Sequence, residues 1–310
     1  MRIVISEFMD EAAVAMLASR FDVCYDQTLV DRQAPFNDAL ASADALIVRN
    51  RTQVSGALLD AAPQLAVVGR LGVGLDNIDR AACEARNIAV IPATGANAQA
   101  VAEYVIATAM ILLRGAYAST QTVANGDWPR AALSNGRELA GKTLGIVGFG
   151  SIGRLTGRMA RALGMRVIGY DANLPASAPP WADEATRART FDEVLAEADV
   201  VSLHVPLTHE TRNLIGAVNI AKMKHDAILI NTARGGVVDE TAVAAALYAD
   251  KLGGAALDVF ADEPLRAGSA LAECPRLLLT PHIAGVTRES NVRVSMMIAE
   301  KVAAALTARA

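Results

Sequence analysis

The stretch TLGIVGFGSIG, residues 143–153, decides the fold of this chain. Its glycines follow the G-x-G-x-x-G pattern, with a strand-like apolar run before them and a helix-like stretch after them. A second strand-like run ends in Asp171, about 20 positions further on, which is the layout of a βαβ unit that binds a dinucleotide. A glycine-rich turn without a ligand is the alternative. Asp171 can accept both ribose hydroxyls of NAD, and its charge would repel the 2′-phosphate of NADP, so the sequence predicts NAD as the cofactor.

Each glycine of the pattern has a separate expected role. Gly148 allows the tight turn, Gly150 lets the backbone approach a pyrophosphate, and Gly153 lets helix and strand pack closely. The helix that follows begins at Ser151 and Ile152. Its free N–H groups and partial positive charge suit the phosphates of the cofactor.

Strand-like and helix-like patterns alternate along the 310 residues, a length that suggests about two domains. Such alternation predicts parallel sheets that are covered on both faces. We expect two α/β lobes that join near residues 96–102. The predicted strands are residues 3–5, 45–48, 65–68, 88–91, 143–147, 166–170, 200–205, 227–231, 254–259 and 277–279.

The composition narrows the class of protein. A net charge of −4 provides no basic field for a nucleic acid or an acidic membrane. The three cysteines (Cys24, Cys83 and Cys274) are far apart and favour a reducing compartment. No signal peptide is visible, the longest apolar run is too short to span a bilayer, and no metal-ligand spacing occurs. We therefore expect a cytoplasmic protein that binds no metal.

Residues 101–113 (VAEYVIATAMILL) are apolar nearly all round at helical period. A helix without a polar face must be covered on every side. Two alternatives stay open: a central core helix, or a helix that packs against its own lobe and also against a second subunit.

Arg234, Glu263 and His282 each follow a predicted strand in the second half of the chain. Ligands of open parallel sheets bind beyond the carboxyl ends of the strands, so these side chains could converge on the cofactor. Hydride transfer to or from a carbonyl carbon needs a proton on the oxygen, which histidine can give and take. A neighbouring carboxylate would favour the imidazolium, and a guanidinium would bind a substrate carboxylate at two points. The alternative is three ordinary loop charges.

The chain resembles the D-isomer-specific 2-hydroxyacid dehydrogenases over nearly its whole length. The matching segments are GRLGVGLDNID (69–79), the glycine turn, HVPLTHET (204–211), NTARGGVVD (231–239), LDVFADEP (257–264) and TPHIAG (280–285). The resemblance implies that Arg234 binds the substrate carboxylate, that His282 is the acid/base, and that Glu263 is its partner. It also implies that the backbone at Val73 and Gly74 lies against the substrate carboxylate. Further cofactor contacts are implied for His204, Val205, Pro206, Thr211, Thr232, Ala233, Asp258 and Gly285, with Asp258 on the nicotinamide amide.

The family fold implies an α/β chain of two doubly wound parallel-sheet domains. Residues 1–97 and 286–310 would form a discontinuous, flavodoxin-like substrate domain, and residues 98–285 a Rossmann NAD-binding domain. Homodimers through the helix after the first lobe are usual in the family. Many relatives carry Arg or Lys where this chain has Ser151, so we expect backbone N–H groups to hold most of the pyrophosphate.

The loop VRNRT (48–52) bears on the substrate. Arg49 and Arg51 are two apart and would share a face in extended backbone, with Asn50 between them at the mouth of the cleft. Because Arg234 already serves one carboxylate, extra arginines suit a second anionic group on a substrate such as sulfolactate. Solvated surface arginines are the alternative.

Other functions stay open. Oxidation of 3-phosphoglycerate and reduction of hydroxypyruvate or glyoxylate use the same chemistry. A corepressor-like module that binds NAD and peptides would share the fold without the activity. Formate oxidation is disfavoured, because formate dehydrogenases use a Gln near the place of Glu263.

Overall fold

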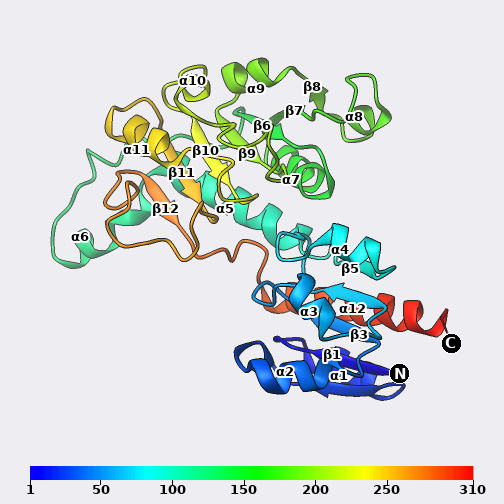
Figure 1. Ribbon diagram of the computed structural model, residues 1–310. Helices are drawn as coiled ribbons and strands as arrows, with labels where there is room; N and C mark the ends of the chain where they lie inside the picture. Colours follow the sequence, from blue (N-terminus) through cyan, green and yellow to red (C-terminus); the bar gives the residue numbers. More distant parts are fainter. Residues whose placement is uncertain (310) are drawn as a thin grey trace. The chain divides into compact units, whose positions relative to one another are not determined.

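The computed structural model describes residues 1–309, which divide into two compact units. The first comprises Met1–Asn97 together with the segment from Val286 onward, and the second comprises Ala98–Gly285. Each unit contains one parallel sheet with helices on both faces, so the predicted α/β class is confirmed (Figure 1). The functional roles given to the two domains stay predictions.

The first unit has a five-stranded sheet in the order β2-β1-β3-β4-β5. Successive residues of β1 point to opposite faces: Ile3 and Ile5 pack with α1 and α12, whereas Val4 packs with α2, α3 and α4. The strands are β1 (Arg2–Ile5), β2 (Asp22–Tyr25), β3 (Ala45–Val48), β4 (Val67–Arg70) and β5 (Ala89–Pro92). The helices are α1 (Glu11–Ala18), η1 (Leu29–Asp31), α2 (Gln33–Leu40), α3 (Gly56–Asp60), α4 (Arg80–Ala85) and α12 (Arg288–Thr307).

Helix α12 completes one face of this sheet from the far end of the sequence. Its buried residues Val294, Ile298 and Val302 belong to the same apolar cluster as β1 and α1. The approach is close, because a Cβ added to Gly69 of β4 would lie 2.7 Å from Val302 Cγ2. Glycine at this position therefore lets helix and strand pack without a gap.

The second unit has a seven-stranded parallel sheet in the order β12-β11-β10-β9-β6-β7-β8. Helices α5 and α7 cover one face, and α9, α10 and α11 cover the other. The strands are β6 (Thr143–Val147), β7 (Arg166–Tyr170), β8 (Arg187–Ala188), β9 (Val200–Leu203), β10 (Ile228–Asn231), β11 (Gly254–Leu257) and β12 (Leu277–Leu279). The helices are α5 (Ala98–Arg114), η2 (Tyr117–Ser119), α6 (Thr120–Ala124), α7 (Ser151–Ala162), α8 (Pro179–Asp183), α9 (Phe191–Glu197), α10 (Ala217–Ile220) and α11 (Glu240–Tyr248).

Strand β6 marks the point where the strand order reverses, because the chain continues to β7 on one side and later to β9 on the other. Doubly wound sheets bind their ligands at such a point. The glycine turn lies directly after β6, so the topology places it at the expected position.

Helix α5 is mostly buried and packs on α7 and on the sheet of its own unit. The segment with η2 and α6 lies to one side of that sheet in Figure 1. Among residues 1–309, no single helix is long and apolar enough to cross a bilayer, and only the bent pair Ala98–Arg114 with Tyr117–Ala124 (72°) meets that test.

Candidate active site

Arg234, Glu263 and His282 follow three neighbouring strands, β10, β11 and β12, which run parallel. Their loops therefore share one edge of the sheet in the second unit. The loops also touch: a Cβ added to Gly235 would lie 1.7 Å from Phe260 O. The predicted convergence of these loops is what the topology produces.

The loop of Arg234 is shaped by a buried amide. Asn231 is the last residue of β10, its Oδ1 accepts from Ala233 N (3.0 Å), and its Nδ2 donates to Arg234 O (3.0 Å). These two bonds satisfy backbone groups that the strand ladder no longer serves. The Arg234 guanidinium donates to Ala233 O (2.5 Å). Asn231 therefore positions the loop, a role that was not predicted.

Glu263 and His282 form a hydrogen-bonded pair. Nδ1 of His282 lies 2.8 Å from Oε2 of Glu263, while Oε1 of Glu263 accepts from Phe260 N (3.0 Å). The carboxylate is thus fixed at both oxygens, and the imidazole is held at Nδ1. The other ring nitrogen, Nε2, has no hydrogen-bond partner among residues 1–309. The pair can hold a proton on Nδ1 and exchange one at Nε2.

His282 has left-handed backbone geometry, with φ 56°. Its N–H donates to Asp258 O (2.8 Å) and to Thr280 O (3.0 Å), which holds this uncommon conformation in place. Asp258, just after β11, is buried, and its carboxylate accepts from three donors of the same loop. Those donors are Thr280 Oγ1 (2.6 Å), Ile283 N (2.8 Å) and Ala284 N (2.8 Å). Asp258 thus builds the loop that carries His282, besides its predicted role toward nicotinamide.

Tyr104 of α5 extends this network from the helix beneath the sheet. Its hydroxyl lies 2.6 Å from Thr280 Oγ1. Burial raises the pKa of the Tyr104 phenol, as does the nearby charge of Asp258, against the lowering effect of the Thr280 hydrogen bond. The phenol therefore stays protonated. Sequence reasoning missed this residue because Tyr104 and Thr280 are 176 positions apart.

The glycine turn leaves room where a pyrophosphate would approach. A Cβ added to Gly150 would meet no atom within 4 Å, whereas one added to Gly148 would lie 2.5 Å from His204 O. A Cβ on Gly153 would lie 2.3 Å from Gly148 O, so that glycine serves the packing of α7 on β6. Gly150 caps α7 without a side-chain hydrogen bond, and the helix then begins at Ser151 and Ile152. Gly148 and Gly153 thus meet the needs of a tight turn and of close helix–strand packing, and the pyrophosphate role of Gly150 stays a prediction.

Asp171 lies just after β7 and is tied to the turn. Its Oδ2 accepts from Phe149 N (2.8 Å), and its Oδ1 accepts from Asn173 N (2.9 Å). Each oxygen retains a second lone pair that can accept from a ribose hydroxyl. A carboxylate so close to the turn suits the 2′-hydroxyl of NAD better than a 2′-phosphate.

A second polar group fits a bound dinucleotide. Thr232 Oγ1 is buried and has no hydrogen-bond partner within residues 1–309. A buried hydroxyl without a partner costs free energy unless a ligand or water supplies one. Thr232 and Ala233 follow β10, so the Thr232 hydroxyl lies at the edge of the sheet where ligands are expected to bind.

The segment after β9 also adjoins the turn, because His204 N donates to Val147 O (2.7 Å). His204 is partly buried, its Nε2 lies 2.9 Å from Ser202 Oγ, and burial lowers its pKa to about 4. A neutral ring fits the predicted lining role and not a proton-transfer role.

The loop after His204 contains three more of the predicted cofactor residues. Val205 and Pro206 continue this loop, and Thr211 closes it by donating from Oγ1 to Pro206 O (2.6 Å). Gly285 is the last residue of the second unit.

In the first unit, Val73 and Gly74 lie in the loop after β4. Among the described residues, neither backbone N–H has a hydrogen-bond acceptor. Two such donors in sequence can bind a carboxylate, as predicted for this loop.

The expectation that Arg49 and Arg51 share one face of extended backbone was wrong. The chain bends at residues 50–52, directly after β3. Arg51 is exposed and forms an ion pair with Asp31. Arg49 is partly buried, and its Nη2 donates to Asn291 Oδ1 (2.9 Å) in α12. The two side chains therefore have separate partners, with Asn50 exposed between them.

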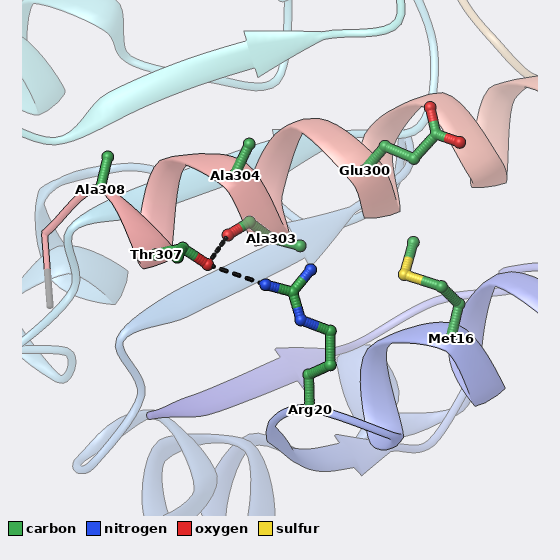
Figure 2. A pocket seen from close by; sticks show the side chains of 7 residues that line it. All are labelled: Met16, Arg20, Glu300, Ala303, Ala304, Thr307 and Ala308. Atoms are coloured by element: carbon green, nitrogen blue, oxygen red, sulfur yellow. Dashed lines mark hydrogen bonds between the residues drawn. The ribbon is translucent and has the colours of Figure 1, made fainter.

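A surface hollow of about 580 Å³ lies elsewhere in the first unit, between α1 and α12 (Figure 2). Arg20 reaches across it and donates from Nη2 to Thr307 Oγ1 (3.1 Å). The rest of the lining consists of Met16, Glu300, Ala303, Ala304 and Ala308. None of the predicted site residues borders this hollow, so it has no part in the candidate site. Among residues 1–309, no cluster of three or more His, Cys, Asp or Glu side chains could hold a metal.

Comparisons with known proteins show which family the sequence and the fold resemble. Residues 106–284 match the D-isomer specific 2-hydroxyacid dehydrogenase, NAD binding domain family. (S)-Sulfolactate dehydrogenase of Chromohalobacter salexigens is 53% identical over 308 residues, which cover 99% of both chains. D-3-Phosphoglycerate dehydrogenase of Synechocystis is 37% identical over 97% of this chain, which spans only 53% of that relative's length. The crystal structure of D-lactate dehydrogenase from Aquifex aeolicus with NAD and lactic acid superposes with a TM-score of 0.81, at 28% identity, over 99% of this chain and 96% of that one.

Proposed function

The chain belongs to the D-isomer-specific 2-hydroxyacid dehydrogenase family, and we propose that its substrate is a 2-hydroxyacid with a second anionic group, such as sulfolactate. It is an NAD-dependent oxidoreductase. The observation that carries the proposed chemistry is the His282–Glu263 pair at the end of β12, with Nδ1 and Oε2 2.8 Å apart. The relative that is 53% identical over the whole chain supports the choice of substrate.

NAD, held by the glycine turn and Asp171, would supply the acceptor for a hydride from the substrate carbon and, when reduced, the hydride for the reverse reaction. The chain's own residues handle the proton. Nε2 of His282 takes the proton of the substrate hydroxyl during oxidation and returns it to the carbonyl oxygen during reduction. Glu263 fixes the ring through Nδ1 and stabilises the imidazolium that forms.

We propose that the remaining predicted residues divide between substrate and cofactor. Arg234 binds the substrate carboxylate, to which Val73 and Gly74 add backbone N–H groups. Asp258 accepts from the nicotinamide amide. The further cofactor contacts are Gly148, Gly150, Ser151, Ile152, Gly153, Asp171, His204, Val205, Pro206, Thr211, Thr232, Ala233 and Gly285.

Arg49 is our candidate for the second anionic group. No carboxylate among residues 1–309 lies within ion-pair distance of its guanidinium, whereas Arg51 is already paired with Asp31. Burial lowers the pKa of Arg49 despite the opposing charge of Glu7, so an anionic ligand at the guanidinium would stabilise its charged form. 3-Phosphoglycerate is the second candidate substrate, because the same guanidinium suits a phosphate and a relative of that name matches the chain.

We also propose a homodimer in the cytoplasm. The segment after α5 exposes several large apolar side chains, among them Tyr117 (65% exposed) and Trp128 (76% exposed). Exposed apolar groups so close in sequence are typical of a protein interface. Analytical ultracentrifugation tests this proposal, and a monomer at micromolar concentration would contradict it.

The test of the function is NADH oxidation with a panel of 2-oxoacids: sulfopyruvate, 3-phosphohydroxypyruvate, hydroxypyruvate, glyoxylate and pyruvate. We expect the acids with two anionic groups to give the highest kcat/KM. His282→Gln should lower kcat at least about 100-fold and leave the affinity for NADH unchanged. The matched control is His225→Gln, whose side chain is 86% exposed. A His282→Gln variant with the parent rate would remove the assigned acid/base, and a chain that oxidises NADH with none of the acids would be a binding module.

A further inference from the structure

Glu7 is a buried carboxylate that no step of the proposed chemistry uses. It lies two residues after β1 and is 3% exposed. Its Oε1 accepts from the backbone N–H of Arg49 (2.9 Å) and Thr52 (3.0 Å). Its Oε2 accepts from the N–H of Asn50 (3.2 Å) and Arg51 (3.0 Å). One side chain therefore satisfies four consecutive backbone donors of the turn 49–52.

The same turn is also held through its carbonyl groups. Asn77 Nδ2 donates to Thr52 O (2.7 Å) and to Arg49 O (3.4 Å). The hydroxyls of Ser6 and Thr52, both buried, lie 2.9 Å apart. The turn thus takes its shape from residues that are distant in sequence, and Glu7 makes the largest share of those bonds.

The hydrogen bonds to Glu7 favour its ionised form. Burial alone would raise the pKa of the carboxyl group, but hydrogen bonds from the N–H groups of Thr52, Arg49 and Arg51 outweigh it and lower the pKa. The group therefore stays ionised at neutral pH, with all four acceptor positions available to the turn.

The side chain of Arg49 depends on the position of this turn. Its Nη2 donates to Asn291 Oδ1 (2.9 Å), and its Cζ lies 5.7 Å from the ring centroid of Phe8. Asn291 belongs to α12 and Phe8 follows Glu7, so both supports are fixed to the body of the unit. A shift of the turn would move the guanidinium away from both supports.

We infer that Glu7 is a positioning residue that sets substrate specificity, because it fixes the turn 49–52 so that Arg49 is preorganised for the second anionic group of the substrate. This inference rests on the proposed function. A guanidinium already held in place loses little conformational freedom when it binds an anion, so the benefit appears as affinity for that group. Substrates without the second group gain nothing from it.

Glu7→Gln tests the inference with little change in volume. The amide keeps one acceptor oxygen but places an NH₂ group against two backbone N–H donors, so the turn must shift. With NADH and sulfopyruvate, or 3-phosphohydroxypyruvate if the panel favours it, we expect KM to rise at least tenfold and kcat to stay within about twofold. With pyruvate, kcat/KM should stay within about twofold. The matched control is Glu11→Gln, an exposed glutamate at the start of α1.

A double-mutant cycle with Arg49→Ala shows whether Glu7 acts through Arg49. The effect of Glu7→Gln on KM should disappear in the Arg49→Ala background. Equal losses with both classes of substrate in Glu7→Gln would indicate a structural role alone and overturn the inference. A large effect of Arg49→Ala beside a neutral Glu7→Gln would overturn it too, while leaving the second-anion proposal intact. Equal effects of Arg49→Ala on both classes of substrate would instead refute the second-anion proposal.

Two further measurements guard against a folding defect. Amide hydrogen exchange should be faster in Glu7→Gln at residues 49–52 and unchanged elsewhere in the chain. If Glu7→Gln does not fold, Asn77→Ala removes the donor that holds the turn from its other side. The same selective rise in KM is expected for that variant, and a parent-like KM would contradict the inference.

Discussion

The hydroxyl oxygen of Tyr104 lies 2.6 Å from Oγ1 of Thr280, which in turn lies 2.6 Å from Oδ1 of Asp258. The carboxylate can only accept, so the single proton of Thr280 goes to Asp258 and Tyr104 donates to Thr280. The order of the chain of hydrogen bonds is thereby fixed. It joins a buried helix to the loop that carries His282.

Tyr104→Phe should remove the first of these bonds and leave the packing of α5 unchanged. A lost hydrogen bond of about 1 kcal/mol corresponds to a roughly fivefold lower kcat if it serves the geometry of His282. The Kd for NADH should stay within about twofold, because Asp258 keeps its hydrogen bonds from Thr280, Ile283 and Ala284 and the glycine turn is not involved. Steady-state kinetics and fluorescence titration measure both quantities.

The matched control is Tyr248→Phe, whose hydroxyl donates to Ala272 O (3.2 Å) in an exposed position. It should have parent activity. If Tyr104→Phe also has parent activity, the network does not position His282.

Gly150→Ala and Gly153→Ala separate cofactor binding from folding. The methyl group at position 150 has open space, so the melting temperature should be nearly unchanged while NADH binds at least about tenfold more weakly. The methyl group at position 153 would lie 2.3 Å from Gly148 O, and it should destabilise the fold by about 1–3 kcal/mol. Thermal unfolding with and without NADH distinguishes the two. Parent-like affinity in Gly150→Ala would rule out this turn as the pyrophosphate site.

His204 predicts a pH dependence of stability. Its pKa is lowered by burial from 6.5 to about 4, so the unfolded chain binds this proton more readily than the folded one. The folded state has its full advantage above pH 6.5 and loses it progressively as the pH falls toward 4. Between pH 7 and 5 the loss should be about 1–2 kcal/mol, allowing for the partial exposure of the ring.

Urea unfolding of the NAD-free protein at both pH values measures this loss. His204→Gln should show a smaller difference between them than the parent does. A difference as large in the variant as in the parent would mean that other groups cause the acid sensitivity. His225→Gln, with its exposed side chain, serves as the control.

The sequence predicts most strands well, because they read as continuous apolar runs, and this includes the edge strand β12. The strands at 45–48, 143–147, 166–170 and 277–279 agree with β3, β6, β7 and β12 to the residue. The edge strands β2 and β8 were missed. β2 is only partly covered, and its short apolar run Val23–Tyr25 lies between Asp22 and Asp26, whereas β8 has only two residues.

The candidate site also contains residues that can be predicted from a short local motif and residues whose role depends on partners that are distant in sequence. Residues of short motifs, such as Glu263 and His282, can be found by spacing. Glu7 and Tyr104 could not, since their bonds reach partners more than 40 positions away. An acidic residue two positions after a buried strand is the one local signal that could have pointed to Glu7. The bend at residues 50–52 follows from that carboxylate, which is why the assumption of extended backbone failed.

The place of α12 in the first unit has a consequence for biosynthesis. Its residues Val294, Ile298 and Val302 cover one face of a sheet whose first strand, β1, begins at Arg2. A ribosome has made residues 1–287 before this helix begins, whereas every residue of the second unit has been made by Gly285. The nascent chain can therefore fold its second unit first. Until α12 is made, one apolar face of the sheet in the first unit stays uncovered and can bind chaperones. Loss of α12 would leave that face permanently exposed.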